Sequence, residues 1–196
     1  MLRAALALIA LALAPAGCLH RPRSTADLFP AAITPMGHRG AAGLAPENTV
    51  AAFHEAAERG LPFELDVRLT AAGDLVVFHD DDLERLAGAS GPIAARALAD
   101  LKQLDVGARF DPRFRGERIP TLDEVLHLFG GRVVINIEIK AGKGADPGPI
   151  ADAVVAAIAR HGLRDRVVVT SFNPFVLERV RARDPAIRRG QIYGTF

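Results

Sequence analysis

The sequence predicts an α/β fold made of parallel β/α units. Its 196 residues are 49% hydrophobic and 24% charged, which suits one folded domain with a sizeable core. From residue 34 onward, short apolar runs rich in Val and Ile alternate with segments of helical spacing. Strands that alternate with helices of this length usually form a parallel sheet with helices packed against it. Lys plus Arg number 24 and Asp plus Glu 23, without long runs of one sign, so nucleic acid is not an expected partner.

Six segments have the apolar character and the length of β-strands: 34–40, 63–70, 75–80, 132–140, 166–172 and 187–193. Helical spacing is found between them, at 47–60, 95–104, 121–130, 149–162 and 174–184. We expect Asn48 to cap the first of these helices and Gly60 to end it. Thr121 and Glu124 predict a capping box. The remaining part of 81–120 is polar and partly rich in Gly and Pro, so we expect a long surface loop there.

The segment 63–70 alternates apolar and polar residues, so one face of this strand is apolar and the other carries Glu64 and Asp66. A Gly turn joins it to 75–80, either as a hairpin or as a sharp connection at one end of a sheet. A strand with a solvated polar face is the simpler interpretation. The alternative is a polar face that points inward, which buries two carboxylates and requires a compensating charge.

Ionisable side chains gather at the expected ends of several strands: His38 and Arg39, Glu64 and Asp66, His79 and Asp80, and Glu138 and Lys140. In a β/α barrel these carboxyl ends form the mouth of the active site, so the groups converge if the sheet closes. Three carboxylates that meet in one cavity repel one another unless a cation lies between them. Hard oxygen ligands suit Ca²⁺ or Mg²⁺, and the absence of nearby cysteine argues against zinc.

Five short motifs occur in an order that resembles the glycerophosphodiester phosphodiesterase family: Gly-His-Arg-Gly at 37–40, Pro-Glu-Asn-Thr at 46–49, Glu-Leu-Asp-Val-Arg-Leu-Thr at 64–70, His-Asp at 79–80 and Ile-Glu-Ile-Lys at 137–140. The resemblance covers about residues 34–196. It implies a TIM (β/α)8-type barrel. It also implies hydrolysis of small-molecule glycerophosphodiesters to glycerol 3-phosphate and an alcohol, with a bound divalent cation, Ca²⁺ or Mg²⁺.

The roles that the resemblance implies at matching positions are metal ligands at Glu64, Asp66 and Glu138, an acid–base pair at His38 and His79, and phosphate contacts at Arg39 and Lys140. Glu47 is expected to lie behind these groups, paired with Arg39 or Arg68, and Arg68 is expected to help balance the charge of the site. A phosphodiester is negatively charged and repels nucleophiles. Its hydrolysis therefore needs positive charge at the phosphate and groups that move protons.

The six expected strands supply about six of the eight β/α units of a TIM barrel, which typically has about 250 residues. We therefore expect an incomplete barrel that lacks units on its C-terminal side. Three interpretations stay open: a fragment of a longer active enzyme, a non-catalytic exported half-barrel, and a related barrel phosphodiesterase that acts on phospholipids or lysophospholipids.

Residues 1–17 have the layout of a secretory signal peptide, because Arg3 precedes an apolar run over 4–14 and small residues follow. The run is shorter than the roughly 20 apolar residues of a membrane-spanning helix. We expect an exported protein in which 18–33, with scattered Pro, forms a tether to a domain over 34–196.

Cys18 is the only cysteine, so no intramolecular disulfide can form. Together with Gly17 it resembles the end of a bacterial lipobox, whose cysteine is lipidated and becomes the first mature residue. Pro15 stands where that motif usually has Leu, so simple cleavage after Ala14 or Ala16 is the alternative. The expected location is the periplasm, either as a free protein or as a lipoprotein attached to the membrane through Cys18.

Overall fold

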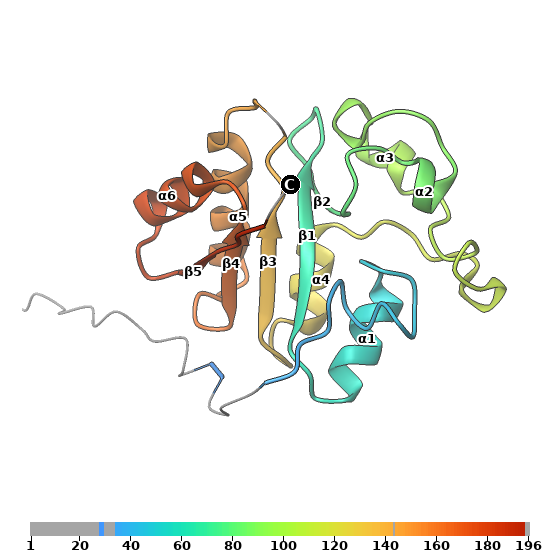
Figure 1. Ribbon diagram of the computed structural model, residues 1–196, viewed down its shortest axis with the longest axis horizontal. Helices are drawn as coiled ribbons and strands as arrows, with labels where there is room; N and C mark the ends of the chain where they lie inside the picture. The colour runs from blue at the N-terminus through green and yellow to red at the C-terminus, as the bar shows by residue number, and fades with distance from the viewer. Residues whose placement is uncertain (1–27, 30–33, 143, 195–196) are drawn as a thin grey trace, which may run out of the picture.

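A five-stranded sheet in the order β2-β1-β3-β4-β5 forms the centre of the protein (Figure 1). The computed structural model describes residues 28–29, 34–142 and 144–194. The strands are β1 (Phe63–Leu69), β2 (Leu75–Val77), β3 (Ile135–Ile139), β4 (Val167–Ser171) and β5 (Arg188–Gln191). Parallel pairing joins β1, β3, β4 and β5, whereas β2 pairs with β1 in the antiparallel direction. The α/β fold with parallel β/α units is therefore confirmed.

The amino-terminal part of the sheet differs from the expected series of strands. The segment 34–40 makes a single parallel bridge between Gly37 and Phe63 instead of a full strand. The chain leaves the extended conformation at Arg39 and Gly40, whose φ angles are 53° and 78°. β2 forms a hairpin with β1, which is one of the two arrangements that the sequence left open. The described residues thus contain fewer parallel strands than the six that were expected to build barrel units.

The helices are α1 (Val50–Glu58), α2 (Glu84–Ala87), α3 (Leu98–Leu101), α4 (Leu122–Phe129), α5 (Gly148–Arg160) and α6 (Pro174–Arg183), and short 3-10 turns occur at η2 (Ile93–Ala95) and η3 (Pro112–Phe114). The expected capping box at Thr121 and Glu124 begins α4. The expected cap of α1 was wrong, because the side chain of Thr49 caps this helix and that of Asn48 does not. Asn48 has a φ angle of 57°, so the chain turns sharply just before the helix.

The main apolar core lies between one face of the sheet and the helices α1, α4, α5 and α6. Phe63, Leu65 and Val67 of β1 are fully buried in it. The Phe63 ring stacks on the Phe53 ring of α1, with centroids 4.6 Å apart. Burial of each such side chain contributes about 1.5–3 kcal/mol. Because side chains alternate along a strand, Glu64 and the other polar residues of β1 lie on the opposite face of the sheet, away from these helices.

The segment between β2 and α4 forms a lobe that carries α2, η2, α3 and η3 (Figure 1). The lobe packs around an apolar cluster of its own, which includes Phe78, Ile93 and Leu101. This lobe occupies the place of the long surface loop expected over 81–120, and η2 brings it into contact with β1. One wall of the site region is therefore made by a folded segment with its own small core.

No helix among the described residues is both long and apolar enough to cross a membrane. The expected signal peptide over 1–17 and the expected lipidation site at Cys18 lie outside the described residues. Of the expected tether over 18–33, the structure describes only residues 28–29.

Candidate active site

Three carboxylates from two neighbouring strands form a buried cluster. Glu64 and Asp66 belong to β1 and Glu138 belongs to β3, and the parallel register places Asp66 directly beside Glu138. One carboxylate oxygen from each residue lies within 4.8 Å of the others. The exposed fractions are only 7% for Glu64, 1% for Asp66 and 7% for Glu138. The polar face of β1 therefore points inward and is not solvated, which is the second of the two alternatives that the sequence left open.

The electrostatics of this cluster favour a bound cation. Burial, together with the negative charges of Asp66 and Glu138, raises the pKa of Glu64 to about 8. The Oε1 atom of Glu64 is buried and accepts no hydrogen bond from the described residues. A buried carboxylate oxygen without a partner and two further carboxylates nearby are a donor set that suits a hard divalent cation. The positions of Glu64, Asp66 and Glu138 are compatible with the role of metal ligands that the sequence predicts. Metal binding itself stays a prediction.

Lys140 supplies positive charge at one side of the cluster. Its Nζ atom lies 3.1 Å from Oδ1 of Asp66 and also pairs with Oε1 of Glu138. The ammonium group lies 5.6 Å from the centre of the Phe172 ring, within the range of a cation–π contact. Lys140 directly follows β3, so its charge is positioned to balance the carboxylates.

Arg39 approaches the cluster from the other side. Its backbone N–H donates a hydrogen bond to Oε2 of Glu64 at 2.8 Å, and its guanidinium donates to Glu47 at 2.8 Å. Its Nε atom lies 3.6 Å from Oδ2 of Asp66. Of the two expected partners of Glu47, the structure thus brings Arg39 into contact. Arg68 instead donates to the backbone carbonyl of His79, at 2.9 Å from Nε.

Asn48 holds Asp66 in place with both ends of its amide. Nδ2 of Asn48 donates to Oδ2 of Asp66 at 2.8 Å, and Oδ1 of Asn48 accepts from the Asp66 backbone N–H at 3.2 Å. The sequence pattern pointed to a helix cap, because Asn before an apolar helical stretch is a common cap. Its left-handed backbone conformation, which Asn adopts more readily than most residues, turns the side chain toward β1 instead.

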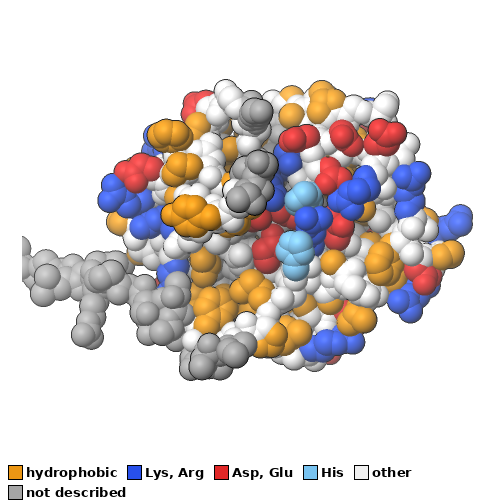
Figure 2. All heavy atoms as spheres, viewed as in Figure 1, with side chains coloured by type: hydrophobic (Ala, Val, Ile, Leu, Met, Phe, Trp, Pro, Cys, Tyr) orange, Lys and Arg blue, Asp and Glu red, His pale blue; other side chains and the backbone are white. Residues whose placement is uncertain are grey.

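The two candidate proton-transfer residues are His38 and His79. His38 has a side chain that is 73% exposed, and its Nε2 atom lies 4.0 Å from Oε2 of Glu64. The side chain of His79 is 32% exposed, and its Nδ1 atom lies 2.7 Å from Oδ1 of Asp80. Figure 2 shows histidine side chains among basic and acidic ones near the centre of this face.

Arg85 extends the site in a way that the sequence did not reveal. Arg85, on α2, donates to both oxygens of Asp80 at 2.6 and 3.0 Å and to both oxygens of Glu47 at 2.9 and 2.7 Å. The Arg85 guanidinium beside Asp80 holds the pKa of that carboxyl at about 2. The adjacent His79 and Asp80 at the end of an expected strand were a sequence signal for a site at this position. Arg85 is a single arginine in a polar segment, and no motif in the sequence marks it as part of the site.

Comparison with known proteins gives a consistent match. Residues 38–195 match the family model described as "Glycerophosphoryl diester phosphodiesterase family". The chain is 41% identical over 160 residues to a glycerophosphodiester phosphodiesterase of Caldanaerobacter subterraneus subsp. tengcongensis, a match that covers 81% of this chain and 65% of the relative. It is 32% identical to a glycerophosphodiester phosphodiesterase of Bacillus subtilis, in a match that covers 95% of this chain and 70% of the relative.

Solved structures give the same result. An Oleispira antarctica phosphodiesterase in complex with the product sn-glycerol-3-phosphate superposes with a TM-score of 0.77 at 36% identity, covering 81% of this chain and 65% of that one. A glycerophosphodiester phosphodiesterase from Agrobacterium tumefaciens superposes with a TM-score of 0.72 at 36% identity, covering 80% of this chain and 66% of that one. The chain therefore spans about two thirds of the length of the proteins that it resembles.

Proposed function

Because the chain belongs to the glycerophosphoryl diester phosphodiesterase family, we propose that it hydrolyses glycerophosphodiesters to glycerol 3-phosphate and an alcohol. The observation that carries this proposal is the buried cluster of Glu64, Asp66 and Glu138, with Oε1 of Glu64 left without a hydrogen bond among the described residues. The relatives named as such phosphodiesterases, and the relative solved with glycerol 3-phosphate, support the substrate class.

Glu64, Asp66 and Glu138 would hold a divalent cation, which we propose to be Ca²⁺ or Mg²⁺ because all three supply hard oxygen atoms. When bound, this cation would neutralise charge on the non-bridging phosphate oxygens. Arg39 and Lys140 lie on two sides of the same carboxylates. Their side chains would add positive charge where the negative phosphate approaches, which lowers its repulsion of an incoming nucleophile.

His79 is oriented for proton transfer by its neighbour. Asp80, with its low pKa, is ionised and can only accept a hydrogen bond, so Nδ1 of His79 must carry the proton that they share. Nε2 of His79 is then the nitrogen that exchanges a proton with substrate. We propose that His38 and His79 divide the proton work, one taking a proton from the attacking hydroxyl and the other giving one to the leaving alkoxide.

The experiment is an assay of glycerol 3-phosphate release from glycerophosphocholine by the purified chain, with Ca²⁺ or Mg²⁺, before and after treatment with a chelator. We expect turnover that stops on chelation and returns when either cation is restored. Turnover that continues unchanged in excess chelator would rule out the carboxylate cluster as a metal centre. The Glu55→Gln variant on α1 serves as a control, because Glu55 pairs with Arg59 and is not one of the three clustered carboxylates.

For the amino terminus, we propose export directed by residues 1–17, followed by lipidation of Cys18. The support is the sequence alone: one basic residue, an apolar run and an Ala-Gly-Cys ending. Mass spectrometry of the mature protein from cells tests the proposal. A lipid-modified Cys18 at the amino terminus is expected, and Cys18→Ser is expected to release the protein from membranes. A mature terminus at Pro15 or Gly17 would show simple cleavage into the periplasm instead.

A further inference from the structure

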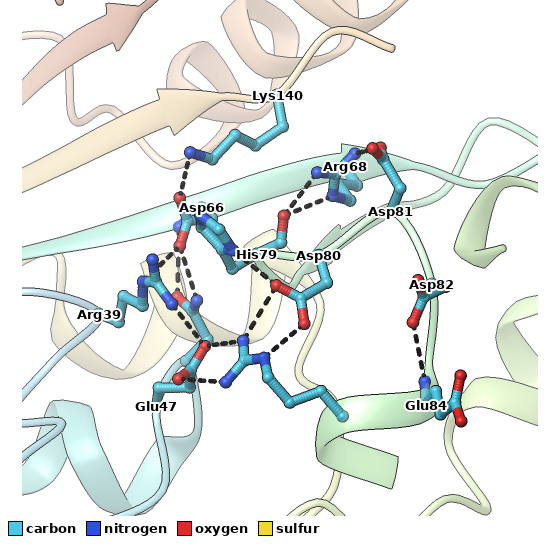
Figure 3. Close-up of polar contacts among 12 residues, drawn as sticks. Arg39, Glu47, Asp66, Arg68, His79, Asp80, Asp81, Asp82, Glu84 and Lys140 are labelled. Carbon is cyan, nitrogen blue, oxygen red and sulfur yellow. Dashed lines mark hydrogen bonds and ion pairs between the residues drawn. The ribbon is translucent and has the colours of Figure 1, made fainter. Parts of the chain in front are cut away.

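A cleft of about 420 Å³ opens beside the carboxylate cluster, between the lobe that carries η2 and the connection that leads from β3 to α5. We call it the side cleft, and its apolar lining includes Leu69, Ile93, Ala94, Ala145 and Ile150. Lys140 belongs both to this cleft and to the carboxylate cluster. Figure 3 shows Lys140 on the side of Asp66 that faces away from Glu47.

The side cleft lies at the seam between the two apolar clusters of the protein. Ile150 and Leu69 belong to or pack against the main core, whereas Ile93 belongs to the cluster of the lobe. The Ile93 backbone N–H donates to the carbonyl of Asp81 at 3.0 Å, which fixes the lobe wall. Ile93 and Ile150 are themselves buried. The apolar walls are therefore parts of packed cores and are set in position before any ligand enters.

The polar side chains of the side cleft already have partners. Arg68 bonds to the carbonyl of His79 and pairs with Asp81. Lys140 pairs with the carboxylate cluster, and Asp146 accepts a hydrogen bond from the Gly148 N–H at 2.8 Å. A ligand rich in hydroxyl groups would have to displace these contacts, whereas a hydrocarbon chain needs only the apolar walls.

We propose that the side cleft binds a hydrocarbon arm of the phosphodiester substrate, so that the preferred substrates carry an alkyl or acyl chain on one side of the phosphate. This inference rests on the proposed function, because it places the phosphate at the carboxylate cluster. A phosphate held beside Lys140 lies at the entrance of the side cleft, and one of the two arms of a diester can enter it. The other arm remains over the cluster and the two histidines.

The test uses glycerol 3-phosphate esters of straight-chain alcohols, from ethyl to octyl, kept below micelle-forming concentrations. Burial of each methylene is worth about fourfold in kcat/KM, so the six additional methylenes of the octyl ester should raise its value above that of the ethyl ester by about 10³ to 10⁴-fold. A second series carries the chain on the glycerol, as 1-acyl glycerophosphoethanolamines. The series in which kcat/KM rises with length identifies the arm that enters the cleft. A flat profile in both series, with turnover present, overturns the inference and leaves the proposed function standing.

The chain offers a matched pair of variants in η2. Ala94 and Ala95 are neighbours and both are exposed, but only Ala94 lines the side cleft. We expect Ala94→Asp to lower the octyl-to-ethyl ratio of kcat/KM by at least about tenfold, because it places a charge against the chain. Ala95→Asp is expected to keep the wild-type ratio. An equal effect of both variants contradicts the assignment of the cleft.

A binding measurement separates failure of the cleft from failure of the proposed function. The affinity of n-alkyl phosphates is measured by calorimetry with Ca²⁺ present, and it requires no turnover. If the affinity rises with the length of the alkyl chain but the protein has no diesterase activity, the cleft is supported and the proposed function is refuted. Affinity and turnover that are both independent of chain length refute the cleft, and absence of both binding and turnover refutes both proposals.

Discussion

Nδ1 of His79 lies 2.7 Å from Oδ1 of Asp80, and this contact orients the imidazole. Because Asp80 is in turn bound by Arg85, the position of His79 depends on a guanidinium whose hydrogen bonds go to Asp80 and Glu47. The site therefore has an inner group of carboxylates and an outer network of ion pairs that holds its histidine in place.

Replacing His79 with alanine should lower turnover by about 10² to 10⁴-fold, the usual contribution of a positioned acid or base. Cation affinity and melting temperature should stay close to wild type, because His79 is partly exposed and is not one of the three clustered carboxylates. Glycerol 3-phosphate release, calorimetric titration with Ca²⁺ and thermal melting measure the three quantities. His54→Ala, an exposed substitution on α1, is the control and should be neutral. Retained turnover in His79→Ala would refute the assignment.

Arg85→Gln should reduce kcat by about 10 to 100-fold through loss of the hydrogen bonds that position Asp80 and Glu47. Arg85→Lys keeps the charge but loses the forked geometry, so only partial rescue is expected. The pH profile of kcat identifies a positioning effect, because loss of Arg85 leaves Asp80 free to protonate at higher pH and shifts the acidic limb upward. Arg59→Gln removes an exposed arginine–carboxylate pair on α1 and should leave the profile unchanged. An unshifted profile in Arg85→Gln contradicts the positioning role.

Two substitutions of Asn48 separate its backbone role from its side-chain role. Asn48→Gly keeps the φ angle of 57° accessible but removes both amide contacts to Asp66. Asn48→Ala removes the same contacts and adds backbone strain of about 1–2 kcal/mol. Both variants should lose about tenfold in cation affinity, and the alanine variant should unfold more easily. Denaturant unfolding and calorimetry measure these effects. Wild-type cation affinity in Asn48→Gly would show that the amide does not organise Asp66.

The raised pKa of Glu64 predicts how the stability of the metal-free protein depends on pH. Between the unfolded value of 4.5 and about 8, the folded protein holds a proton that the unfolded chain has lost. The free energy of unfolding should therefore fall as pH rises through this range, by at most about 1.4 kcal/mol per pH unit for one group. Because cation binding needs the carboxylate, Ca²⁺ affinity should rise over the same range.

Thermal melting in chelator between pH 5 and pH 9 measures the stability effect. Glu64→Gln cannot ionise and should flatten the profile relative to wild type. Added Ca²⁺ should raise the melting temperature of the wild type most strongly at the alkaline end. A melting temperature that rises steadily with pH in chelator would contradict the account of the cluster.

Strand periodicity alone anticipated that Glu64 and Asp66 share one face, whereas the inward direction of that face remained one of two alternatives. Side chains two residues apart share a face, so Glu64 and Asp66 lie together and the apolar residues between and around them enter the core. Glu138 follows from the same alternation in β3. The parallel register that sets Asp66 beside Glu138 was an inference from the β/α pattern, and the structure has that register.

The contacts of Arg85 in the outer network could not be anticipated, because they join segments whose relative position no periodicity encodes. Arg85 reaches Glu47 across 38 residues, from a four-residue helix in the lobe. Asn48 was predicted to be a helix cap because it precedes an apolar helical stretch. Its left-handed backbone conformation could not be predicted from the sequence. For the same reason, the sequence predicted a strand over 34–40. The positive φ angles at Arg39 and Gly40, which end the extended conformation there, could not be predicted.

The dependence of glycerol 3-phosphate release on cation concentration tests the central claim most directly, in wild type, Glu138→Gln and the control Glu55→Gln. If Glu64, Asp66 and Glu138 hold the cation that turnover requires, wild type and Glu55→Gln should share one half-saturating concentration. Glu138→Gln should need at least about tenfold more cation, because one charged oxygen ligand is replaced by a neutral one. The same half-saturating concentration in all three proteins would contradict the account.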